Sequence, residues 1–356
     1  MAVRATAILH GRPIPQVARR SRSRPVSRCG RRVPPDVRAS VDATSKVGAR
    51  TGGDARRVPV LIVPGFLSSA SEYEGMADAL RRFDASVDVF VVPLKTKDWY
   101  PTLVGGNFRA ILDAVDRAAT EALRASGSPP EETRLRVVGH SAGGWLARTW
   151  LGSSPYLGRT YGGARKTRVL LTLGTPHYSL ERYPFGRAPE KLFVDAEAEA
   201  SFARENKRRS ADASETRGAE SPWTASRAAE STLALTNFRY PGAFEAGVRY
   251  VSVCGCGVVG ATPRRWVADA LGLEREAERA TLASVGAGVS YAASCGACDG
   301  VDGDGVTPLR SAMLIGAKEL VLTGVTHKPK PGETDDAWYG APRVVRRWAP
   351  ELLDDE

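Results

Sequence analysis

Residues 135–143 read Leu135-Arg136-Val137-Val138-Gly139-His140-Ser141-Ala142-Gly143. The first four of these residues are typical of a buried strand, and Gly144-Trp145-Leu146-Ala147-Arg148 after them is typical of a helix. A serine therefore lies at the apex of a sharp turn between a strand and a helix. Only small residues fit two positions before and after a serine held in this way, and Gly139 and Gly143 meet that condition.

A serine becomes an effective nucleophile only beside a base that is itself oriented by an acid. In chains with this turn, the order along the sequence is serine, then acid, then histidine. Only His327 lies well beyond Ser141 with carboxylates between them; the other histidines are His10, His140 and His177. The carboxylates crowd one turn, as Asp299, Asp302 and Asp304. A solvated acidic turn is one alternative, and a calcium loop is another, although the EF-hand spacing is not met.

These motifs resemble the α/β-hydrolase superfamily, and its lipases in particular, in which an Asp-Gly-Val-x-Pro turn carries the acid. The matching turn here is Asp304-Gly305-Val306-Thr307-Pro308. The resemblance runs from about residue 58 to the C-terminus and rests on scattered motifs in the right order. It implies that Ser141 is the nucleophile, His327 the base and Asp304 the acid, with Asp302 as the reserve candidate.

The resemblance also implies two donors for an oxyanion. The apolar run 57–63 ends in Pro64-Gly65-Phe66, where the family places one backbone N–H donor, here that of Phe66. The second donor would be the N–H of Ala142, directly after the serine. The family usually has His-Gly in this loop, but a proline at position 64 leaves the backbone donor in place. The alternative is that Gly65 merely makes a turn.

Apolar runs alternate with helical patterns along the chain, which predicts a parallel sheet with helices on both faces. The expected strands are 57–63, 87–92, 135–138, 168–173, 248–253 and 318–323, and the expected helices include 107–125 and 338–353. We therefore predict the α/β class, with an α/β-hydrolase fold in residues 58–356. Residues 178–247 are polar and unlike sheet core, and we expect them to form an inserted cap or lid.

Residues 1–57 differ in composition from the rest. They hold 14 Lys and Arg against 3 Asp and Glu, a net charge of +11, whereas the whole chain carries +10. The predicted domain is thus close to neutral, which argues against nucleic-acid binding. Nine arginines precede the first acidic residue, Asp36, without a sustained apolar run. This composition is typical of an organelle transit peptide. We expect a chloroplast location, with a mitochondrial leader or a basic arm as alternatives.

Four cysteines flank the segment that leads to the acidic turn. Cys254 and Cys256 alternate at a strand end, and Cys295 and Cys298 form a C-x-x-C pair. Three interpretations stay open: reduced and inert thiols, a redox-active disulfide with thioredoxin as partner, and a zinc site. The zinc interpretation departs from the usual ligand spacing, and we predict no metal and no cofactor.

The expected activity is that of a serine hydrolase that cleaves carboxylic esters through an acyl-enzyme. Within the superfamily, the lipase-like and GPI inositol-deacylase-like hydrolases of plants and algae are the most similar. This resemblance and the expected compartment imply an acyl-lipid ester as substrate, with peripheral membrane contact. Alternatives on the same triad are a phytyl-ester or thioester hydrolase and an acyltransferase. A non-catalytic ligand receptor of the same fold is an alternative of another class.

Overall fold

The computed structural model describes residues 57–126, 133–179, 231–271, 280–329 and 337–354. The predicted leader 1–57 lies outside the described residues apart from its last position, and so does 180–230 of the predicted cap. None of the helices in the described ranges is long and apolar enough to cross a membrane.

Six parallel strands form the central sheet, in the order β2-β1-β3-β4-β5-β8. Their bounds are β1 Val58–Val63, β2 Val87–Val91, β3 Leu135–His140, β4 Thr167–Leu173, β5 Arg249–Cys256 and β8 Lys318–Thr323. The central strands are nearly continuous apolar runs because both faces of a parallel sheet are covered. The predicted fold class, a mostly parallel sheet with helices on both faces, is confirmed.

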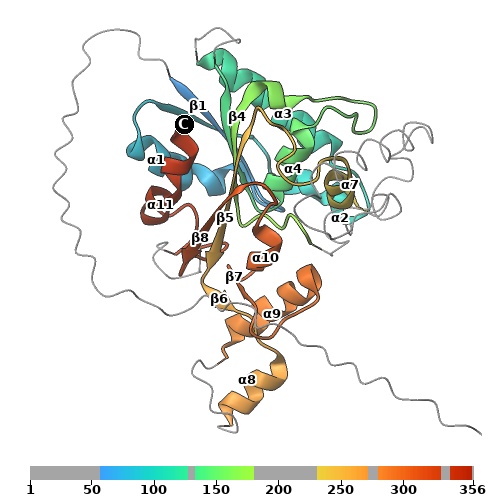
Figure 1. Cartoon of the computed structure of the whole chain (residues 1–356), viewed down its shortest axis with the longest axis vertical. Helices are drawn as coiled ribbons and strands as arrows, with labels where there is room; N and C mark the ends of the chain where they lie inside the picture. Colours follow the sequence, from blue (N-terminus) through green and yellow to red (C-terminus); the bar gives the residue numbers. More distant parts are fainter. Residues whose placement is uncertain (1–56, 127–132, 180–230, 272–279, 330–336, 355–356) are drawn as a thin grey trace, which may run out of the picture. The chain divides into compact units, whose positions relative to one another are not determined.

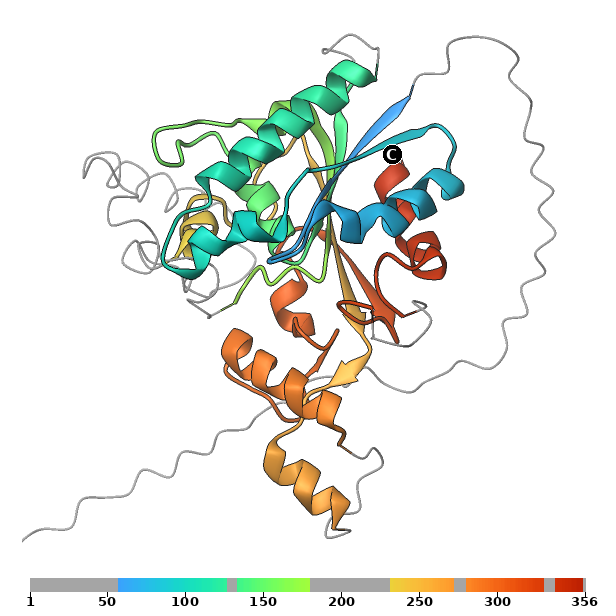
Figure 2. The same cartoon turned by 180° about the vertical axis from the view of Figure 1, so that it is seen from behind.

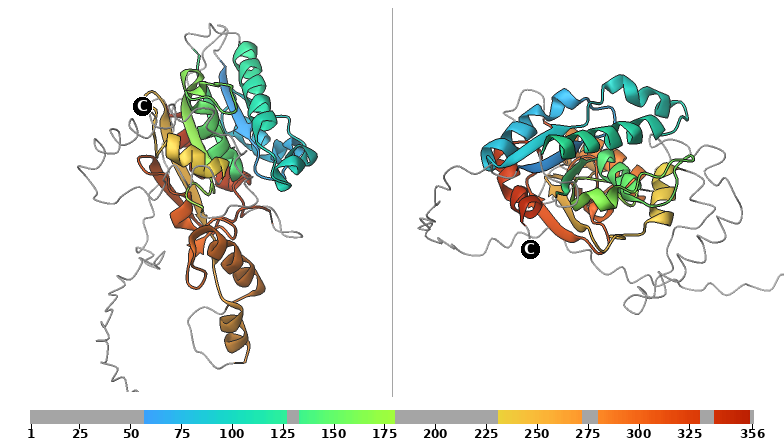
Figure 3. Two further views of the ribbon diagram at one scale, coloured as in Figure 1. Left: turned by 90° about the vertical axis from the view of Figure 1, so that its right-hand side faces the viewer. Right: turned by 90° about the horizontal axis from the view of Figure 1, so that it is seen from above.

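Two helical layers cover the sheet (Figures 1 and 3). One layer holds α1 (Glu74–Phe83) and α11 (Pro342–Leu353), and the other holds α3 (Arg109–Ala125), α4 (Ala142–Leu151) and α7 (Thr232–Arg239). Alternate side chains of β1 enter the two layers: Val60 and Ile62 pack with α1 and α11, whereas Leu61 and Val63 pack with α3 and α4. The apolar core therefore lies on both sides of the sheet.

Two elements differ from the sequence-based expectation. The last helix begins at Pro342 instead of Trp338, because proline favours the first turn of a helix, and residues 338–341 pack into the core before it. The helix α7 falls within the predicted cap segment, yet every residue of it is buried. The C-terminal end of that segment is therefore part of the core.

A small appendage follows β5 and was not predicted. It contains β6 (Val258–Val259), α8 (Pro263–Ala270), α9 (Leu282–Cys295) and β7 (Asp302–Gly303), with β6 and β7 paired antiparallel. Figures 1 and 2 show it beyond the carboxyl end of β5, and α10 (Leu309–Ala312) leads back to the sheet. The remaining short helices are η1 Ala70–Tyr73, η2 Thr96–Trp99, α2 Tyr100–Leu103 and η3 Gly163–Lys166.

Candidate active site

Ser141 occupies a strained turn between β3 and α4. Its φ of 51° and ψ of −128° are rare for a residue with a side chain, and its N–H donates to Leu173 O at 2.9 Å. The backbone is packed so closely that a Cβ at Gly143 would lie 2.2 Å from Val63 O. Ser141 is partly exposed at the carboxyl edge of the sheet. The turn thus presents a serine hydroxyl at a fixed position with access from outside.

The loop after β1 lies against this turn. A Cβ on Gly65 would come within 2.9 Å of Ser141 Cβ, so only glycine allows the approach. The Phe66 ring packs edge-on against Trp99, with ring centroids 5.6 Å apart. Ala142 is the first residue of α4, where N–H groups have no acceptor within the helix and carry the positive end of its dipole. The loop and the helix start therefore flank Ser141, the arrangement that the predicted donors Phe66 and Ala142 require.

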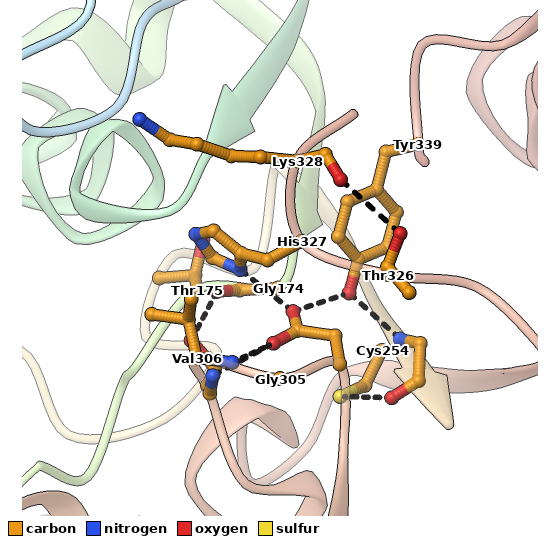
Figure 4. A network of polar contacts seen from close by, with 12 residues as sticks. Gly174, Thr175, Cys254, Gly305, Val306, Thr326, His327, Lys328 and Tyr339 are labelled. Atoms are coloured by element: carbon orange, nitrogen blue, oxygen red, sulfur yellow. Dashed lines mark hydrogen bonds and ion pairs between the residues drawn. The ribbon is translucent and has the colours of Figure 1, made fainter. Parts of the chain in front are cut away.

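The Asp304 carboxylate accepts four hydrogen bonds (Figure 4). Its Oδ1 accepts the N–H groups of Val306 at 3.0 Å and Thr307 at 2.7 Å. Its Oδ2 accepts from His327 Nδ1 at 2.7 Å and from Tyr339 Oη at 2.8 Å. Only 1% of Asp304 is exposed, so these donors replace water as the partners of the carboxylate. The carboxylate is held in one orientation toward His327.

His327 lies in the loop after β8 and is buried. Its own N–H donates to Asp304 O at 2.8 Å, so backbone and side chain are both tied to the acidic turn. Because a carboxylate only accepts, the imidazole proton belongs on Nδ1, and Nε2 keeps a lone pair. The ring of His327 also lies 4.7 Å from that of His140, the residue before Ser141. His327 therefore lies against the residue that directly precedes Ser141.

The reserve acid Asp302 lies elsewhere, on β7, where it pairs with Val259. His177 is fully buried, and its imidazole contacts Thr172 and Arg148. The structure therefore brings His327 together with Asp304 and leaves Asp302 and His177 outside the pair.

The four flanking cysteines are free thiols in the structure. Burial raises the pKa of the Cys254 thiol well above its usual value, and the nearby Asp304 charge raises it further. Cys256 ends β5, Cys295 ends α9, and Cys298 follows in the next loop. Within the described ranges, no three His, Cys, Asp or Glu side chains are placed to hold a metal ion.

Sequence reasoning missed Tyr339, although it contacts the acid directly. Gly255 N–H donates to Tyr339 Oη at 2.7 Å, so the hydroxyl proton is directed to Asp304. The Trp348 indole N–H in turn donates to Tyr339 O at 3.0 Å and anchors the tyrosine to α11. No local motif marks this tyrosine, since its role depends on the fold bringing residues 304 and 339 together.

Comparison with known proteins gives a likeness of fold. No protein-family model and no curated protein sequence matches the chain. Among solved structures, a Bacillus licheniformis lipase in its mature form is 14% identical, with 85% of this chain and 94% of that chain covered and a TM-score of 0.45. A metagenomic carboxyl esterase is 14% identical over 85% of this chain and 77% of its own, with a TM-score of 0.43.

A phospholipase from Legionella pneumophila is 13% identical over 84% of this chain and 60% of its own, with a TM-score of 0.43. With identities of 13–14% and TM-scores below 0.5, these likenesses carry no argument about this chain. Any function has to be inferred from the chain's own residues.

Proposed function

We propose that this protein is a serine hydrolase that cleaves carboxylic esters through a covalent acyl-enzyme. Ser141 attacks the ester carbonyl, and His327 Nε2 accepts the hydroxyl proton and later returns it to the leaving alcohol. Asp304 orients the imidazole and stabilises its protonated form. The N–H groups of Phe66 and Ala142 stabilise the negative oxygen of the tetrahedral intermediate. Water then repeats the sequence on the acyl group and releases the acid.

One observation carries this proposal: the buried pair of His327 Nδ1 and Asp304 Oδ2, 2.7 Å apart, lies at the sheet edge where Ser141 is held in a strained turn. The other oxygen of the carboxylate is saturated by two backbone N–H groups, those of Val306 and Thr307. Such saturation fixes the acid in position before any substrate arrives. Preorganisation of this kind is what lowers a barrier in acyl transfer.

The substrate class that we propose is an acyl-lipid ester. Support comes from exposed apolar side chains on α9 and in the acidic turn. On α9, Leu282 is 70% exposed and Val289 is 65% exposed, and Val306 in the turn is 44% exposed. Ser290 Oγ donates to Val306 O at 2.7 Å, which joins α9 to the turn. Together with the proposed chloroplast address, this favours a membrane lipid over a polar ester. A phytyl ester, a thioester or acyl transfer would use the same residues.

The test is labelling with a fluorophosphonate probe, which reacts with activated serines. The protein is expressed without its leader, and wild type is compared with Ser141→Ala and His327→Ala. The matched control is Ser86→Ala, which removes a hydroxyl before β2 at the opposite edge of the sheet. We expect labelling of the wild type and the control and none of the other two variants. No labelling of the wild type, with or without reductant, would favour the non-catalytic receptor.

A further inference from the structure

A second chain of hydrogen bonds lies behind Ser141, on residues that the proposed mechanism does not use. Gly65 N–H donates to Tyr73 Oη at 2.8 Å, and Tyr73 Oη contacts His140 Nδ1 at 2.7 Å. His140 Nε2 then contacts His327 O at 3.1 Å. Tyr73 and His140 are almost completely buried. The chain therefore joins the backbone of the loop after β1 to the backbone of the loop that carries His327.

The two ends of this chain fix its direction. A backbone N–H only donates, and a backbone carbonyl only accepts. His140 must therefore carry its proton on Nε2 to reach His327 O, and its Nδ1 accepts the Tyr73 hydroxyl proton. The Tyr73 oxygen in turn accepts Gly65 N–H. Every donor meets one acceptor, and hydrogen bonds aligned in one direction strengthen one another.

His140 is held neutral in this position. Burial lowers its pKa well below the ordinary value, and the charges of His327 and Lys328 lower it further. Its ring centroid lies 4.7 Å from that of His327. The lowered pKa favours the neutral His140 imidazole, which keeps the donor and acceptor roles that the chain needs.

We propose that Tyr73 and His140 are positioning residues that couple the loop carrying the oxyanion donor to the loop carrying the base. This inference rests on the proposed function. Gly65 is packed so closely against Ser141 that a shift of its loop changes the geometry at the nucleophile. The two loops are far apart in sequence, and the chain holds both to one buried pair of side chains. Misplacement of reacting groups by about 1 Å can cost about 100-fold in rate.

Two variants break the chain at different points. Tyr73→Phe removes the acceptor of Gly65 N–H, and His140→Asn keeps an acceptor near Nδ1 but loses the donor to His327 O. The matched control is Tyr156→Phe: Tyr156 is equally buried and accepts Phe108 N–H at 3.1 Å, away from Ser141. Tyr73→Phe and Tyr156→Phe each remove a hydroxyl that makes two buried hydrogen bonds, so loss of stability alone affects the two variants alike.

We expect Tyr73→Phe and His140→Asn each to lower kcat on a p-nitrophenyl acyl ester by about 10- to 100-fold, with KM changed less than about threefold. The double variant should be no slower than the slower single variant, because each substitution interrupts the same chain. Tyr156→Phe should keep kcat within about twofold of wild type. The coupling would be overturned if both variants, with kcat calculated per folded molecule, had the same kcat as the Tyr156→Phe control.

A spectroscopic measurement separates this inference from the proposed function. Histidine ¹⁵N spectra of the wild type should show His140 protonated at Nε2 and unprotonated at Nδ1, and Tyr73→Phe should shift the His140 signals. Protonation at Nδ1 overturns the inference even if the enzyme is active. The expected tautomer in a protein that turns over no ester supports the chain and contradicts the proposed function.

Discussion

Replacing Asp304 by asparagine probes how the acid acts on the base, because the two side chains have the same shape. Oδ1 faces two backbone N–H donors, those of Val306 and Thr307. The new amide nitrogen cannot lie there, so it must take the place of Oδ2. There it meets His327 Nδ1 and Tyr339 Oη. His327 can remain bonded only by giving up the Nδ1 proton, and its Nε2 then carries the proton and cannot accept one from Ser141.

Because His327 would then hold the wrong tautomer, kcat should fall by about 10⁴-fold. This corresponds to about 5 kcal/mol of transition-state stabilisation. The assay is steady-state hydrolysis of a p-nitrophenyl acyl ester, with circular dichroism to show that the variant is folded. Asp302→Asn is the matched control, because Asp302 lies on β7 and is expected to stay within about twofold of wild type. Activity above about one tenth of wild type in Asp304→Asn, or a loss of activity in Asp302→Asn of the size expected for Asp304→Asn, would show that Asp304 does not orient His327.

Three other predictions concern individual residues. Tyr339→Phe removes one donor to Asp304 and leaves Gly255 N–H without its acceptor, so kcat in the ester assay should fall by about 10-fold. An unchanged kcat would show that Tyr339 does not hold Asp304 in position. Gly143→Ala should lower the melting temperature strongly, because the added Cβ would lie 2.2 Å from Val63 O. Gly286→Ala in α9 should raise the free energy of unfolding by about 0.5–1 kcal/mol, because the added Cβ would meet no neighbouring residue within 4 Å. Equal melting temperatures of the two variants in thermal scans would contradict both expectations. Iodoacetamide followed by peptide mass mapping should modify Cys295 well before Cys254, whose thiol is buried with a raised pKa; the reverse order would show that this part of β5 opens readily.

The sheet was predictable because its strands carry their signal locally. Runs such as Val58–Val63 and Lys318–Thr323 are short, rich in apolar or β-branched residues, and bounded by turn residues. The position of Ser141 was predictable for the same reason, since strand, glycines and helix are contiguous. The pairing of His327 with Asp304 needed the additional knowledge that this turn imposes a chain order on its partners.

Local sequence patterns could not predict the appendage or the contacts of Tyr73 and Tyr339. The helix α9 has no charged residue, and its exposed face resembles a buried one in sequence. Tyr73 and Tyr339 act through contacts with residues that lie 67 and 35 positions away along the chain. The sequence of α7 is too polar to be predicted as core. The helix can be buried because its threonines and Asn237 form hydrogen bonds inside the protein. Such partners appear only when the chain is folded.

Trapping the acyl-enzyme tests whether Ser141 is the nucleophile. The protein is mixed with a slowly hydrolysed p-nitrophenyl ester, quenched in acid within the burst of p-nitrophenol release, and digested for mass spectrometry. We predict one acyl group per chain, on the peptide that contains Ser141, and none in Ser141→Ala. Turnover of the ester with an acyl group on another residue, or with no covalent adduct at any time, would show that Ser141 is not the nucleophile.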